Sequence, residues 1–158
     1  MRISIIILLV FLYSNLASQD AIDAFKLSFV YIGLGSNYNT KQPVFEIENN
    51  EFIYTLQETS SWNGELTMDP DTLVAGKVNR NSIASIIEVL DKLEERNIYR
   101  ISEDMIMSGG VHLIEMEYKQ SKYKIELDNV SHPVAEEIVE ILNKLLPKNV
   151  LKLSLFSS

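Results

Sequence analysis

Two segments with helical periodicity, set among segments that alternate apolar and polar residues, constrain the fold of this chain more than any other feature. The first helix is predicted over 79–97, with Asn81 or Ser82 as its N-cap. The second opens with Ser131 as N-cap and Pro133 in its first turn. Their apolar stripes are formed by Ile83, Ile86, Ile87, Leu90 and Leu93, and by Val134, Ile138, Ile141, Leu142 and Leu145. Each helix therefore has one face to bury.

The remaining chain predicts strands and hairpins. Strands are expected over 25–32, 44–48, 51–57, 72–78, 98–102, 111–118, 123–127 and 151–155. Asn49 and Asn50, which tolerate positive φ, predict one hairpin, and residues 119–122 connect a second. In a hairpin with one polar face, the opposite, apolar face must be covered by another element. The pattern predicts an α+β fold, a two-layer sandwich whose mainly antiparallel sheet of two hairpins plus extra strands is covered by two amphipathic helices.

The first eighteen residues predict a signal peptide. Arg2 is followed by an apolar run of about ten residues, whereas a membrane-spanning helix needs about 20. Residues 13–18 are smaller and more polar. We therefore expect a signal peptide over 1–18, cleavage near Ser18, a single α+β domain over 19–158 and a periplasmic or secreted location without stable membrane insertion after cleavage. A short membrane anchor is the alternative.

Charge and cysteine content limit the classes of partner. The chain has no cysteine, and 14 Lys and Arg stand against 22 Asp and Glu, for a net charge of −8. An exported domain without disulfides depends on its core alone, and this composition favours the bacterial envelope. The acidic balance argues against nucleic acid, which requires a basic face. It favours a basic protein partner through electrostatic steering.

No motif in the sequence predicts a cofactor, a metal or a catalytic residue. The Gly-Leu-Gly at 33–35 lacks the third glycine of a dinucleotide fingerprint, since Tyr38 occupies that place. His112 and His132 have no second ligand at a spacing that fixes metal geometry. Asp69 and Asp71 are the best calcium candidates, but two carboxylates do not make a loop site, and a turn capped by aspartates is favoured.

Candidate binding residues lie in the loops. Trp62 is the only tryptophan and sits in a polar segment, which is typical of an interface anchor. The apolar loop 105–110 offers an adaptable contact surface. The predicted binding residues are Trp62, Tyr38, Met105, Met107, Asp69 and Asp71. In the alternative interpretation, Trp62 folds back over the sheet edge and the loop continues a strand.

The order of segments resembles small exported domains of unknown function common in the Bacteroidetes group. The corresponding residues are 44–56, 81–95, 111–127 and 133–145, which cover most of the chain after the signal segment. Those domains often carry a paired-cysteine turn near the first strand, and this chain has Gly-Leu-Gly at 33–35 instead. The resemblance implies a similar fold and carries no activity.

These features favour an exported, non-enzymatic protein-binding module of the bacterial envelope. Its most specific form is an inhibitor or immunity protein that neutralises a toxin or a cell-wall hydrolase. Two alternatives stay open. One is a structural or folding-accessory envelope protein, and the other is a carboxylate-dependent hydrolase.

Overall fold

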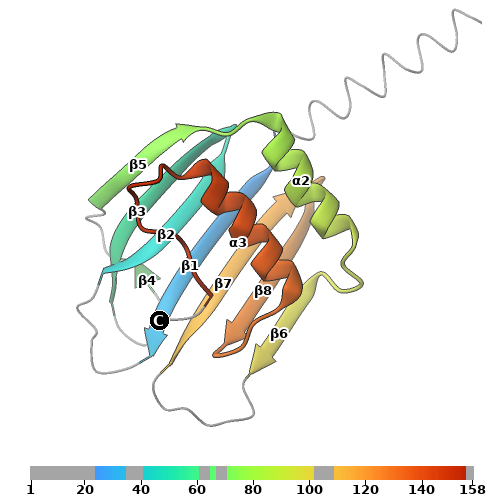
Figure 1. Ribbon diagram of the computed structural model, residues 1–158. Helices are drawn as coiled ribbons and strands as arrows, with labels where there is room; N and C mark the ends of the chain where they lie inside the picture. Colours follow the sequence, from blue (N-terminus) through green and yellow to red (C-terminus); the bar gives the residue numbers. More distant parts are fainter. Residues whose placement is uncertain (1–23, 35–40, 61–64, 67–70, 102–108, 156–158) are drawn as a thin grey trace, which may run out of the picture.

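The computed structural model describes residues 24–34, 41–60, 65–66, 71–101 and 109–155, which form an α+β fold as expected. Helices α2 (Arg80–Asp91) and α3 (Pro133–Leu145) lie on the same face of a sheet (Figure 1). Its strands are β1 (Lys26–Leu34), β2 (Lys41–Glu48), β3 (Glu51–Ser60), β4 (Glu65–Leu66), β5 (Asp71–Lys77), β6 (Asn97–Ile101), β7 (Gly109–Tyr118) and β8 (Ser121–Asp128). The order across the sheet is β4-β3-β2-β1-β7-β8-β6, and β5 also pairs with β3.

The pairings between described strands are antiparallel except one. β6 runs parallel to β8, with Ile98 opposite Ile125. The segment from β5 through α2 to β6 joins strands at opposite ends of the sheet order. Such a crossover can deliver a strand in parallel orientation, which the alternation of apolar residues alone does not encode.

Both predicted hairpins are present, each closed by a two-residue turn. Asn49 and Asn50 have φ of 53° and 62°, and Lys119 and Gln120 have φ of 49° and 63°. Positive φ at both central residues is the geometry that matches the twist of the flanking strands. The second turn is shorter than the predicted loop over 119–122, because Ser121 already pairs with Tyr118 across the ladder.

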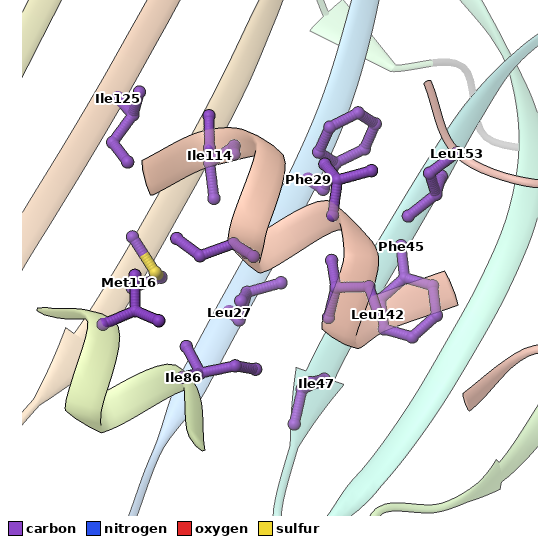
Figure 2. Close-up of a cluster of buried hydrophobic side chains, with 14 of the residues drawn as sticks. Leu27, Phe29, Phe45, Ile47, Ile86, Ile114, Met116, Ile125, Leu142 and Leu153 are labelled. Carbon is purple, nitrogen blue, oxygen red and sulfur yellow. The ribbon is translucent and has the colours of Figure 1, made fainter. Parts of the chain in front are cut away.

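The core lies between the helices and the sheet. Ile87, Leu90, Ile138 and Leu142 of the predicted apolar stripes are at most 8% exposed, which confirms that the stripes supply buried residues. Figure 2 shows Leu142 of α3 among sheet side chains that include Leu27 and Phe45. The buried stripe of α3 also includes Ala135 and Val139, while Val134, Ile141 and Leu145 are only partly buried. The stripe is thus rotated slightly from the predicted one.

Helix α2 is shorter than predicted and has a different cap. Its N-cap is Asn79, whose Oδ1 accepts hydrogen bonds from the backbone N–H of Ser82 at 2.9 Å and from the Ser82 hydroxyl at 3.1 Å. Neither predicted cap, Asn81 or Ser82, has that role. The helix ends at Asp91 rather than 97, because the chain needs the intervening residues to reach β6.

Helix α3 has the predicted Pro133 at its start, but its N-cap is His132 and not Ser131. The His132 Nδ1 accepts a hydrogen bond from the Val134 N–H at 3.3 Å. Burial lowers the pKa of His132, with the charge of Arg100 acting in the same direction. This favours the neutral imidazole that a cap acceptor requires.

At 12 and 13 residues, neither described helix has the length and apolar character to cross a membrane.

The predicted final strand over 151–155 is wrong. Residues 147–155, which we call the strap, double back across the helix-covered face of the sheet without strand pairing (Figure 1). The alternation does describe burial, since Leu153 and Leu155 are buried and Leu151 is exposed. The Leu153 backbone pairs with a side chain: Asn143 Nδ2 donates to its carbonyl at 2.9 Å, and its N–H donates to Asn143 Oδ1 at 2.8 Å.

Candidate functional site

Most of the loop residues predicted to bind a partner lie outside the described part of the chain. Asp71 is within it, as the exposed first residue of β5. The residues outside it are Trp62, Tyr38, Met105, Met107 and Asp69. The structure therefore gives no contact between Asp71 and the other five. Their role in binding stays a prediction.

A different candidate emerges on the face of the sheet opposite the helices, which we call the second face. Side chains alternate along a strand, so the residues between the core positions point to this face. The strand register aligns charged residues from neighbouring strands into a row across it. In order across the sheet, the row consists of Lys77, Glu51, Glu48, Lys26, Glu117 and Lys122.

A second row lies one step further along the strands. It contains fewer cations and one exposed apolar side chain, Ile53, which is 45% exposed. At its centre Ser28 is flanked by Glu46 on β2 and by Glu115 on β7. In order, the row consists of Ala75, Ile53, Glu46, Ser28, Glu115, Lys124 and Asn97.

The residues of the two rows, except Lys77 and Ala75, line a hollow of about 700 Å³. Carboxylates outnumber ammonium groups around it. The charged lining residues are Glu46, Glu48, Glu51, Glu115, Glu117, Lys26, Lys122 and Lys124. We call this surface the acidic hollow.

Local ion pairs neutralise part of this charge. Lys26 pairs with Glu48, and the hydrogen bond and charge of Glu48 raise the pKa of Lys26. Lys124 pairs with Glu126 at 2.9 Å, and that hydrogen bond raises the pKa of Lys124. Both lysines therefore hold their protons firmly. Within the described residues, Glu46 and Glu51 form no ion pair, so the hollow keeps surplus negative charge.

Further along the second face, the side chains of β1 to β3 are buried. Val30 and Val44 are buried, although they do not belong to the main core cluster. Beside them, Thr55 and Gln57 are also buried, and Gln57 Nε2 donates to Thr55 Oγ1 at 2.9 Å. This part of the second face is therefore covered on β1 to β3, whereas Tyr99 and Ile101 of β6 on the same face are exposed.

The described histidines and carboxylates do not form a metal site. Among these residues, no group of three His, Asp or Glu side chains is placed to hold an ion. His112 is buried on the core side of β7, and His132 caps α3. Neither histidine lines the acidic hollow. The five glutamates of its lining can attract positive charge.

Sequence reasoning missed the acidic hollow, although its signal is present. Charged residues alternate with apolar ones at Glu46 and Glu48, at Glu115 and Glu117, and at Lys122 and Lys124. This alternation predicts a polar strand face. Only the order and register of the strands bring these residues of three separate strands together.

Neither a model of a protein family nor a curated protein matches the chain.

Proposed function

We propose that this chain is an exported, non-enzymatic protein-binding module of the bacterial envelope, and that its acidic hollow holds a basic surface of its partner. Residues 1–18 act as the cleaved signal peptide in this proposal. The observation that carries it is a hollow of about 700 Å³ lined by five glutamates and three lysines on the face away from the helices. In this proposal the fold is a two-layer sandwich, in which the helices cover one face of the sheet and leave the other for recognition.

Electrostatics and exposed apolar area support a protein partner. The net charge of −8 favours fast association with a cationic surface, as do Glu46 and Glu51, which form no ion pair with another described residue. Ile53 borders the hollow and is 45% exposed, which provides an apolar contact beside the charges. Inhibition of a toxin or of a cell-wall hydrolase is the most specific form of this function.

Charge reversal at the hollow tests the proposal. The double variant Glu46→Lys/Glu115→Lys changes the charge on both sides of Ser28. The matched control is Glu94→Lys/Glu95→Lys, an equal charge change at exposed positions after α2. Both variants and the unaltered chain are immobilised and exposed to native envelope extract. The proposal requires a stoichiometric partner that the unaltered chain and the control retain and the hollow variant loses.

The purified partner then provides the quantitative measurement. We expect its association rate with the unaltered chain to fall as salt rises, because screening shortens the range of the attraction to about 10 Å at 0.1 M ionic strength. The hollow variant should associate at least tenfold more slowly at low salt, while the control remains within a few-fold of the unaltered chain. Equal rates for both variants would exclude the hollow as the binding surface.

A further inference from the structure

We propose that the strap, residues 147–155, is an acid-releasable cover: protonation of His112 beneath it detaches the strap from the sheet while the rest of the fold stays intact. The strap and the acidic hollow lie on opposite faces of the sheet. The proposal is therefore independent of the proposed function, and either can fail without the other.

Most hydrogen bonds that attach the strap involve groups that do not titrate in mild acid. The Asn143 amide makes its two hydrogen bonds to the Leu153 backbone. Lys152 Nζ donates to three carbonyls at the end of α3, those of Asn143 at 2.9 Å, Leu146 at 2.7 Å and Pro147 at 3.2 Å. A cation at this helix end also interacts favourably with the helix dipole. These contacts define where the strap lies, and they stay available as pH falls.

His112 is the exception. It is 4% exposed, with its ring 4.7 Å from that of Tyr31 and 6.1 Å from that of Phe29 between ring centroids. It hydrogen-bonds the backbone of Ser154 in the strap. Its Nδ1 is buried and has no hydrogen-bond partner within the described residues. The neutral ring thus satisfies one polar contact, to the strap, and a second N–H would have no acceptor.

The surroundings of His112 provide no counter-charge. Burial lowers its pKa to about 4, and the hydrogen bond to Ser154 raises it only in part. The neighbouring groups are the Tyr31 phenol from β1, Leu127 as register partner from β8, and the Ser154 backbone from the strap. No carboxylate or ammonium group contributes to this pKa. A protonated His112 would therefore be an unpaired buried charge, which proteins avoid by hydrating it.

Of the elements around His112, the strap needs the least free energy to move away. β7, which carries His112, is paired along its length with β1 and along most of it with β8. The strap makes no strand pairing, so its local opening exposes fewer backbone hydrogen bonds than separation of strands. The closed strap lowers the pKa of His112 from its ordinary value of 6.5 to about 4. The free energy that favours the closed strap over the open one is therefore complete above pH 6.5 and decreases as pH falls toward about 4.

A single introduced cysteine can report the opening, because the natural chain has none. Leu155→Cys places a thiol at a buried strap position, and Leu151→Cys places one at an exposed position of the same strap. The rate of thiol labelling at Leu155→Cys divided by that at Leu151→Cys cancels the pH dependence of the reagent. With a His112 pKa of about 4 under the closed strap and 6.5 when the strap is open, we expect this ratio to rise roughly 20-fold from pH 7 to pH 5.

Two controls separate strap release from other causes. Val89→Cys reports a buried position of α2 and should stay unlabelled at pH 5, whereas labelling there in step with Leu155→Cys would mean global unfolding and overturn the proposal. Combining Leu155→Cys with His112→Gln, which keeps a polar group but cannot become charged, should abolish the rise. A rise that persists in this variant, or a flat ratio without it, also overturns the proposal.

Hydrogen exchange tests the same event without a cysteine substitution. The Leu153 N–H, which donates to Asn143 Oδ1, should lose protection at pH 5 after correction for intrinsic exchange. Amides of the β1–β7 ladder should keep their protection. Unchanged protection of Leu153 would contradict the proposal even if a cysteine variant behaved as expected.

Discussion

At the scale of single residues, two glycines leave room for neighbouring aromatic rings, the partly buried Tyr31 and the core residue Phe52. A Cβ placed on Gly110 of β7 would lie 2.3 Å from the Tyr31 ring, and one on Gly76 of β5 would lie 2.8 Å from the Phe52 ring. Strand glycines often mark such close approaches, because the missing side chain leaves room for a neighbour. Gly110 is further fixed by Asn129, whose Oδ1 accepts from its N–H at 3.2 Å. The Tyr31 ring is in turn the neighbour of His112.

Gly110→Ala should therefore destabilise the domain by about 1–3 kcal/mol through overpacking, measured by urea unfolding. The cause can be separated from any general effect of a methyl group on β7. In a Tyr31→Ser background the ring is absent, and the same Gly110→Ala change should cost much less. An equal loss of unfolding free energy in both backgrounds would show that the Tyr31 ring is not the obstacle.

At the scale of elements, the cap of α2 gives a prediction with an internal control. Asn79→Ala removes the acceptor for the Ser82 N–H and should lower the free energy of unfolding by about 1 kcal/mol. Asn81→Ala alters the neighbouring asparagine that the sequence favoured as cap, which is exposed in the first turn. It should change stability by less than about 0.5 kcal/mol. Chemical denaturation of both variants checks this, and a larger loss for Asn81→Ala would contradict the assigned cap.

The same helix shows what sequence patterns can and cannot predict about elements. The existence of α2 follows from its apolar stripe, but its cap is Asn79 and not the predicted Asn81 or Ser82 a few residues later. The choice depends on where β5 ends, which is a property of the sheet. The strap is similar: its alternation predicts buried leucines, yet its backbone partner is the side chain of Asn143 rather than a strand. Periodicity reports burial more reliably than it reports pairing.

At the scale of the whole molecule, strand order determines the candidate site. Glu46 and Glu115 are 69 positions apart in sequence, and only β1 between their strands brings them to either side of Ser28. Sequence alternation predicted that these strands have a polar face, but not which strands are neighbours. Long-range antiparallel pairing carries little local signal, so the acidic hollow becomes visible only in three dimensions. The core, by contrast, follows largely from the apolar stripes of the helices.

That core provides the last prediction, since a chain without cysteine depends on it for stability. Leu142 is fully buried where α3 meets the sheet, so Leu142→Ala should cost about 2–5 kcal/mol through lost burial and the cavity left behind. Ile87→Ala on α2 should have a similar effect. Leu151→Ala removes the same atoms as Leu142→Ala from a position that is 67% exposed, and should cost less than about 0.5 kcal/mol. Thermal unfolding distinguishes them, and unchanged melting temperatures for both core variants would contradict the packing of the helices against the sheet.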